Sequence, residues 1–248
     1  MIIDAHAHVS PTDYGSAEAY LELLRKGGIQ RGVVSPGGML DVRRMGNFVT
    51  GKERPNVVPR NDYVGESVES SPMLLGFACM DPKAPGATEA LERHLDQGFR
   101  GMMVSPIVHG FSFTDGSLDE LVSLCGERQV PVVSHIAFRP GTNTVDFAGL
   151  ARRFPRTNFI LEHLGAPPAD QEATTAAAEL DNLFLETSLG SYLHIVETVK
   201  RVGASKVLFG SEYPLSHPVL ELQKVMLLPI PDGEREKILG GNIRELLR

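Results

Sequence analysis

Two histidines near the start of the chain could bind a metal ion. They follow a short apolar run, in the order Asp4-Ala5-His6-Ala7-His8. Residues two apart on a strand face the same side, so both imidazoles would point in one direction. Convergent imidazoles suit a divalent transition metal, which takes further nitrogen or oxygen ligands. The pair therefore predicts a metal centre at the end of the first strand.

Three more side chains that can bind a metal ion lie at the ends of later apolar runs or just after them. His135 and His163 each end one run, and Glu212 follows another. A single histidine after a strand is most often structural. Four of the eight histidines, together with a carboxylate, in this kind of position need another explanation. We therefore interpret the set as one divalent-metal site.

The elements that would position these residues alternate along the chain. The strand candidates are 2–5, 32–35, 74–79, 101–105, 130–134, 158–161, 183–186 and 206–209. Helical periodicity marks 17–26, 87–97, 118–128, 145–154, 172–180 and 192–202. Such alternation predicts parallel strands joined by right-handed crossovers. Eight units in 248 residues predict an α/β fold, a single-domain (β/α)8 TIM barrel over residues 1–248, with an open doubly wound sheet as the alternative.

A barrel would explain how such distant residues act together, because the carboxyl ends of its strands meet at one rim. One segment interrupts the alternation. From about 36 to 61 the chain is rich in Gly, Pro, Arg and Asn and has weak periodicity. Loops of this length are usually functional. The segment is either a lid over the rim or a mobile surface insertion.

The composition limits the classes of partner that the protein is expected to bind. The net charge is −7, from 24 basic and 31 acidic residues, and no basic stripe occurs. This argues against nucleic acid and anionic membranes, and leaves a small-molecule substrate as the expected partner. No apolar run is long enough to span a membrane and no secretory signal stands out, so we expect a cytoplasmic protein. Cys79 and Cys125 lie in apolar stretches, where we expect buried thiols and no disulfide.

Taken together, the motifs resemble the amidohydrolase superfamily. The pattern is similar to the branch that includes aminocarboxymuconate-semialdehyde decarboxylase and related metal-dependent hydrolases. Besides the first motif, the matching stretches are Pro131-Val132-Val133-Ser134-His135, Phe159-Ile160-Leu161-Glu162-His163-Leu164-Gly165, Val207-Leu208-Phe209-Gly210-Ser211-Glu212-Tyr213-Pro214 and Ile238-Leu239-Gly240-Gly241-Asn242-Ile243-Arg244-Glu245-Leu246-Leu247. They span the chain in the expected order. They specify the superfamily and the fold, and leave the substrate open.

The resemblance implies roles for these residues. His6, His8 and His135 would bind the metal, and His163 would lie beside it and orient water or polarise a substrate oxygen. The family normally has aspartate after the last strand, where it binds the metal weakly and takes a proton from the attacking water. This chain has Glu212 there. Its extra methylene leaves open whether Glu212 is both ligand and base or a base only.

The resemblance also bears on the number of metal ions. Binuclear members use a carbamylated lysine or a glutamate at the end of the fourth strand, and the candidate strand 101–105 has neither. We therefore expect one divalent metal ion. Zinc is the first choice, since three imidazoles and a carboxylate leave a position for water. Manganese, iron or cobalt suit the same ligands.

Four residues are candidates for binding the substrate. Arg139 follows His135 closely, and a guanidinium can hold a carboxylate with two hydrogen bonds. Arg43 and Arg44 lie on the long segment, and His109 lies just beyond the fourth strand. Each of them could equally be a solvated surface residue.

Three functions are compatible with these residues. The first is a metal-dependent hydrolase that cleaves a C–O or C–N bond of a small polar or carboxylated substrate with metal-activated water. The second is a metal-dependent, non-oxidative decarboxylase on the same site. The third is a non-catalytic or metal-free barrel that binds a small molecule. The aromatic content of 6%, without tryptophan, favours a small or aliphatic substrate. Barrels of this branch are often dimers, so a homodimer is compatible with the resemblance.

Overall fold

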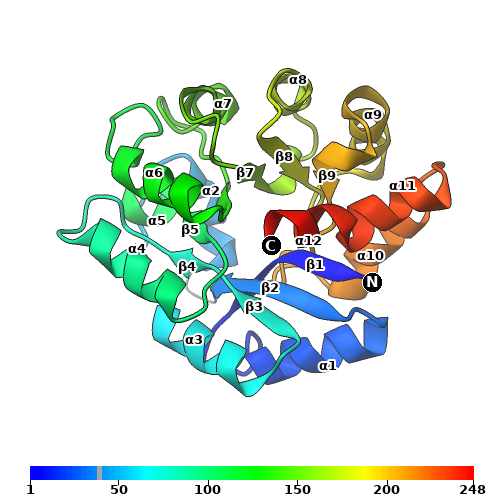
Figure 1. The fold of residues 1–248 in the computed structure, drawn as a ribbon, viewed down its shortest axis with the longest axis horizontal. Coiled ribbons are helices and arrows are strands. Elements are labelled where there is room, and N and C mark those ends of the chain that lie inside the picture. Colours follow the sequence, from blue (N-terminus) through cyan, green and yellow to red (C-terminus); the bar gives the residue numbers. More distant parts are fainter. Residues whose placement is uncertain (38–40) are drawn as a thin grey trace.

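The computed structural model describes residues 1–37 and 41–248, which form a ring of parallel strands surrounded by helices (Figure 1). One sheet pairs β1 (Ile3–Val9), β2 (Arg31–Pro36) and β3 (Leu74–Gly76). The other pairs β4 (Ala78–Cys79), β5 (Met102–Val104), β6 (Val132–Ser134), β7 (Phe159–Leu161), β8 (Leu183–Glu186) and β9 (Val207–Leu208). The strands follow one another in chain order, as crossover connections require.

Two backbone contacts join the sheets into one barrel. The amide of Phe77 donates to the carbonyl of Val34 over 2.9 Å, at the point where β3 gives way to β4. The amide of Ala5 donates to the carbonyl of Phe209 over 2.8 Å, which joins the first strand to the segment after the last. The predicted (β/α)8 barrel is confirmed. Its third strand, expected as one run over 74–79, is divided in two at Phe77.

The helices form the outer layer (Figure 1). They are α1 (Ala17–Gly27), α3 (Asn61–Ser70), α4 (Ala87–Asp96), α6 (Asp119–Arg128), α7 (Thr144–Arg153), α8 (Gln171–Glu179), α9 (Tyr192–Val202) and α10 (Pro218–Met226). Polar side chains fix several of their starts: Ser16, Asn143 and Ser191 each accept a backbone N–H of the first turn. The six predicted helices are all present, and each boundary lies within one residue of its predicted position.

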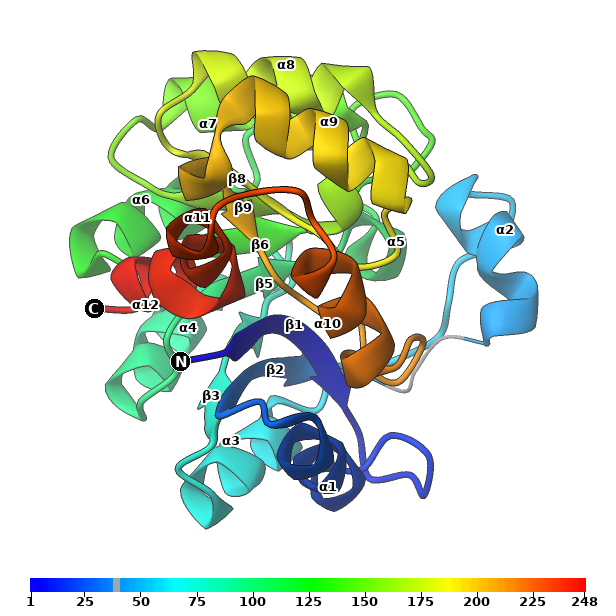
Figure 2. The same ribbon diagram turned by 90° about the vertical axis from the view of Figure 1, so that its right-hand side faces the viewer.

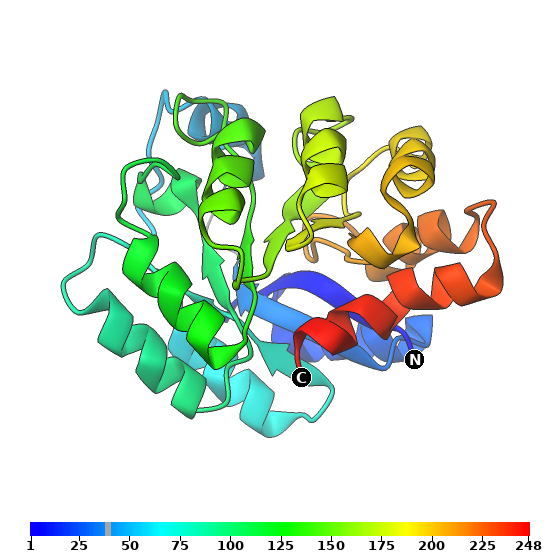
Figure 3. The same ribbon diagram turned by 45° about the horizontal axis from the view of Figure 1, so that its top comes forward.

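Successive residues of each strand pack into two different apolar cores. Val34, Met102 and Val132 pack outward against the helices. Their neighbours Val33, Met103 and Val133 fill the barrel interior. The last helix, α12 (Asn242–Leu246), follows α11 (Asp232–Glu236) and lies beside β1, close to both termini (Figure 3). Ile243 and Leu246 of α12 belong to the interior core, so the amino-terminal end of the barrel is closed by side chains.

The segment predicted as a long loop over 36–61 is partly helical. Residues 38–40 lie outside the described residues. A 3-10 turn (Val42–Arg44) leads into the short helix α2 (Met45–Val49), which stands apart from the ring of helices (Figure 2). Phe48 packs on Ile107 and Ala137, in a small apolar cluster separate from both cores. Ile107 belongs to a further short helix, α5 (Pro106–His109).

Two simpler predictions can be compared with the fold. Cys79 and Cys125 are buried free thiols, as expected. Among the helices in the described ranges, none has the length and apolar character needed to cross a bilayer.

Candidate metal centre

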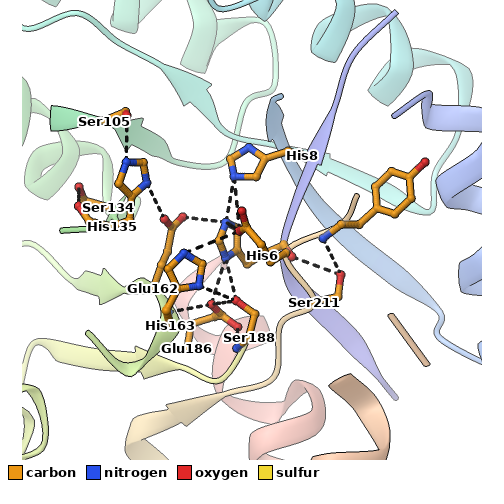
Figure 4. Close-up of polar contacts among 12 residues, drawn as sticks. His6, His8, Ser105, Ser134, His135, Glu162, His163, Glu186, Ser188 and Ser211 are labelled. Atoms are coloured by element: carbon orange, nitrogen blue, oxygen red, sulfur yellow. Dashed lines mark hydrogen bonds and ion pairs between the residues drawn. The ribbon is translucent and has the colours of Figure 1, made fainter. Parts of the chain in front are cut away.

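His6, His8 and Glu212 meet at the carboxyl end of the barrel, where Figure 4 shows the rings of His6 and His8 turned toward each other. The Nε2 atoms of His6 and His8 are 3.1 Å apart. The Oε2 atom of Glu212 lies 2.8 Å from the first of these nitrogens and 3.6 Å from the second. All three side chains are largely buried, and His6 is only 3% exposed. Residues from the first strand and from the segment after the last strand therefore form one compact donor set.

Hydrogen bonds on the far side of each ring show what this set can bind. Nδ1 of His6 faces Glu186 Oε2 at 3.0 Å, and Nδ1 of His8 faces the Pro36 carbonyl at 3.1 Å. A carboxylate and a carbonyl only accept, so each neutral ring donates from Nδ1 and presents a lone pair at Nε2. Glu212 Oε2 is buried and has no hydrogen-bond donor. Three acceptors without a donor between them are suited to a divalent cation.

The charges around His6 lead to the same conclusion. Burial lowers the pKa of His6, but the carboxylates of Glu162 and Glu212 outweigh burial and raise the pKa well above its ordinary value. Burial raises the pKa of Glu212, but the charges of His6 and His8 hold it well below its usual range. Burial lowers the pKa of His8. A proton and a metal ion therefore compete for the same place at His6 Nε2.

The backbone is held in an unusual conformation where it presents this site. Glu212 and His163 adopt left-handed φ angles of 55° and 61°, which cost side-chain-bearing residues about 1–2 kcal/mol each. The amide of Glu212 donates to the His6 carbonyl over 2.9 Å, and that contact fixes the turn. A Cβ on Gly37 would collide with His8, and one on Gly210 would collide with the Glu186 carboxylate. The two glycines therefore allow close contacts that alanine would prevent.

The comparisons with known proteins can now be placed beside this geometry. The amidohydrolase family model matches residues 3–248. The chain belongs to the amidohydrolase family. No curated protein matches its sequence.

Solved structures similar to this amidohydrolase share its fold at low sequence identity. A 5-carboxyvanillate decarboxylase from Sphingomonas paucimobilis has a TM-score of 0.74 at 16% identity, over 100% of this chain and 98% of that one. A dihydroxybenzoic acid decarboxylase from Polaromonas sp. JS666, with bound manganese and an inhibitor, has a TM-score of 0.72 at 18% identity, over 99% and 96%. A probable 2-pyrone-4,6-dicarboxylic acid hydrolase from Acinetobacter baumannii, with citric acid bound, has a TM-score of 0.72 at 14% identity, over 99% and 98%.

His135, predicted as a third histidine ligand, lies next to the donor set of the amidohydrolase and not within it. Its Nδ1 faces Glu162 Oε2 at 3.2 Å, and its Nε2 faces the Ser105 hydroxyl at 3.0 Å. The other oxygen of Glu162 lies 3.1 Å from His6 Nε2. Burial raises the pKa of Glu162, but the charge of His6 and the hydrogen bond from His135 bring it down to about 2. Glu162 therefore connects His135 to the centre as an ionised carboxylate.

His163 lies beside the donor set. Its Nε2 is 3.9 Å from Glu212 Oε2. Its Nδ1 faces the Ser188 hydroxyl at 3.0 Å, and that hydroxyl donates to Glu186 Oε2 over 2.7 Å. Ser188 uses its proton on Glu186, so it accepts from His163 Nδ1. This chain of contacts orients the ring of His163 with Nδ1–H toward Ser188 and Nε2 toward Glu212.

Sequence reasoning missed the residues that orient the ligands. Glu162 and Glu186 have no predicted role, although both are acidic residues at the ends of apolar runs. A carboxylate that ends a buried strand beside a predicted histidine site was the pattern that could have identified them. Asp4, in the first motif, is a further example. It accepts hydrogen bonds from Tyr20 and Ser211, and so ties β1 to the segment that carries Glu212.

A cavity of about 580 Å³ lies over the centre, with His8, His163 and Glu212 in its lining. None of the four predicted substrate-binding residues lines it within the part of the chain that the structure describes. Arg43 and Arg44 are exposed and pair with Asp41 and Glu53. Arg139 donates to the Pro106 carbonyl over 2.6 Å. His109 ends α5, where burial lowers its pKa.

Proposed function

We propose that this amidohydrolase is a metal-dependent hydrolase that cleaves a C–O or C–N bond of a small molecule. One observation carries the proposal. Nε2 of His6, Nε2 of His8 and Oε2 of Glu212 converge at a cavity large enough for a small organic substrate, and a cation there would replace the proton at His6 Nε2. The same cavity supports a small molecule as the partner, in a protein for which we propose a cytoplasmic location.

The ligand set we propose is His6, His8 and Glu212, with one divalent cation. His135 could join it only if its ring turned away from Ser105 and Glu162, its present partners. We propose zinc first, because imidazole and carboxylate together suit it. Manganese also suits nitrogen and oxygen ligands, and a structural neighbour contains it.

A bound cation supplies Lewis acidity, which polarises a carbonyl group and makes water a stronger acid. The chain supplies the proton transfers. Glu212 takes the proton from water as a carboxylate held among the imidazoles. His163, whose Nε2 lies 3.9 Å from Glu212 Oε2, accepts that same proton from Glu212 and passes it to the leaving oxygen or nitrogen, so that Glu212 is a carboxylate again. Glu186 and Ser188 hold His6 and His163 in the tautomers that these roles need.

The alternative, a non-oxidative decarboxylase, would use the same residues. Four of the similar solved structures are named as decarboxylases. An aromatic or unsaturated acid would bring a carboxylate into the cavity, yet among the described lining residues there is no lysine or arginine to pair with it. For this reason we propose hydrolysis as the main activity.

The test begins with metal content. Purified protein loaded with zinc should hold about one equivalent, and His8→Ala should lose most of it, because a three-ligand site is reduced to two. His217→Asn is the matched control, since His217 caps α10 and does not line the cavity. Loaded protein is then assayed with esters, lactones and amides, and with carboxylic acids for release of carbon dioxide. Carbon dioxide without any hydrolysis would replace the hydrolase with the decarboxylase.

A further inference from the structure

Two kinds of residue line the cavity, and they come from different parts of the fold. The polar ones lie at strand ends around the metal centre: His8, Ser105, His135, His163 and Glu212. The connecting segments contribute apolar side chains, with Tyr14 as the exception among the described residues. The cavity therefore has a reactive polar end and an apolar remainder.

The apolar remainder is built largely by the segment around α2 and by the loop after β6. Val42, Met45 and Val49 come from the first, and Phe138 comes from the second. The amide of Phe138 donates to the Val49 carbonyl over 2.9 Å, so the two segments are joined over the cavity. Val42 is 58% exposed and Phe138 is 55% exposed. Large apolar side chains left exposed beside a reactive centre mark a surface that an apolar ligand covers.

Charge is missing from the same surface. Among the described lining residues, Glu212 is the only acidic one and no lysine or arginine occurs. An anionic substituent away from the metal would lose its hydration here without gaining an ionic partner, which is costly.

We propose that the cavity selects substrates in which an uncharged, apolar alkyl group or ring is attached to the ester, lactone or amide carbonyl. Val42, Met45, Val49 and Phe138 are the residues that determine this specificity. The inference rests on the hydrolase function proposed above, and it names the substrate class of that site. It differs from what the names of the structural neighbours indicate, because those substrates are carboxylic acids.

Straight-chain hydroxamic acids test the inference without turnover, because the hydroxamate binds the metal and leaves the tail to the cavity. Dissociation constants are measured by calorimetry on zinc-loaded protein for acetohydroxamic, butanohydroxamic and hexanohydroxamic acids. Burial of each methylene should tighten binding about fourfold. Adipic monohydroxamic acid has the same length as the longest probe but ends in a carboxylate, and should bind at least about tenfold more weakly than that probe. Equal affinity along the series, or tighter binding of the carboxylate, would overturn the inference.

A double variant in α2 tests whether the named residues cause the gain in affinity per methylene. Met45→Gln combined with Val49→Thr adds polar atoms with little change of size, and should reduce the gain per methylene from about fourfold to about twofold. Leu220→Gln is the matched control, since Leu220 is exposed on α10 and does not line the cavity. Zinc content and acetohydroxamic acid affinity report whether the variant remains folded at the centre. An unchanged gain in a variant that keeps both would show that these residues do not set specificity.

The two proposals fail in different ways. A steep hydroxamate series with no hydrolysis of any neutral ester, lactone or amide would end the hydrolase proposal and leave the apolar cavity in place. Hydrolysis that prefers carboxylated substrates, with a flat hydroxamate series, would end the inference and leave the hydrolase in place.

Discussion

The metal centre and the segment 41–53, which we call the lid because Val42, Met45 and Val49 line the cavity, are held in different ways. At the centre, His6, His8 and His163 each have a hydrogen bond behind the ring that fixes its orientation. The lid is a short helix attached through a small cluster around Phe48 and through the hydrogen bond that the Phe138 amide donates to the Val49 carbonyl. The centre is rigid because the barrel and its polar contacts determine it. The lid is held by few contacts, so its side chains can change without cost to the chemistry.

Loss of His163 should have the largest effect on activity. It would test whether separate residues of the centre bind the metal and transfer the proton. His163→Ala removes the proposed proton carrier but none of the three proposed ligands. We expect kcat to fall by about 10²–10⁴-fold, with zinc content unchanged. The comparison is made by steady-state kinetics and elemental analysis of the same sample. Loss of zinc together with activity would place His163 among the ligands.

The orientation of the His6 ring, and with it the metal affinity, should depend on Glu186. Glu186→Gln keeps the size of the side chain but removes the charge that faces His6 Nδ1. Partners of this kind typically contribute 10–100-fold to metal affinity, so we expect zinc affinity to fall by about that factor. Competition with a chelator measures it. Glu53→Gln, on the lid, is the control and should leave the affinity unchanged.

Two glycines line the cavity, one beside the metal centre and one in the lid, so that alanine substitutions at them compare the two regions. A Cβ on Gly37 would collide with His8, whereas nothing lies within 4 Å of a Cβ on Gly46, in α2. Gly37→Ala should destabilise the protein by about 1–3 kcal/mol and weaken zinc binding, because His8 has to move. Gly46→Ala should be neutral, or stabilising by about 0.4–1 kcal/mol. Chemical unfolding of both variants tests this, and equal losses would contradict the distinction.

Zinc binding should strengthen as the pH rises. Burial lowers the pKa of His6, but Glu162 and Glu212 outweigh it and raise that pKa well above its ordinary value. Below the raised pKa, a metal ion must displace one proton, so affinity increases with pH up to it. We expect about a tenfold gain per pH unit between pH 6 and 8. Chelator competition at three pH values measures the slope, and a slope of zero would show that His6 is already neutral.

We expect the smallest effect on stability from a substitution on the surface of the lid. Arg44 pairs with Glu53 at 2.7 Å, and both side chains are at least a third exposed. Glu53→Gln should therefore cost about 0.2–1 kcal/mol of stability, and less at high salt. Thermal unfolding at two salt concentrations measures the cost. A loss that is larger and independent of salt would mean that the lid is held more firmly than its contacts indicate.

The barrel and the histidines at its rim could be predicted from sequence because both depend on local patterns. An apolar run followed by a histidine identifies a strand end, and eight alternating units identify the barrel. The orientation of a ring could not be predicted this way. His6 is oriented by Glu186, 180 positions away, and His135 is turned toward Ser105 and Glu162. Such contacts depend on which strands become neighbours.

The lid was predicted only as a choice between a cover and an insertion. Helix α2 has five residues, too few for periodicity to predict it. Its stability comes from Phe48 against Ile107 and Ala137, residues that are distant in the sequence. The arginines of this segment were candidates for anion binding because of their residue type. Their pairing with Asp41 and Glu53 becomes evident only from the structure.

The closing contact of the barrel bears on how the protein is made. Asp4 binds Ser211, 207 positions later, so the segment after the last strand can join the first strand only once synthesis has passed residue 211. The nascent β1 must therefore stay unpaired on that side throughout most of translation. A cation that joins His6 and His8 to Glu212 would bridge this same seam, so metal supply and completion of folding should be linked in the cell.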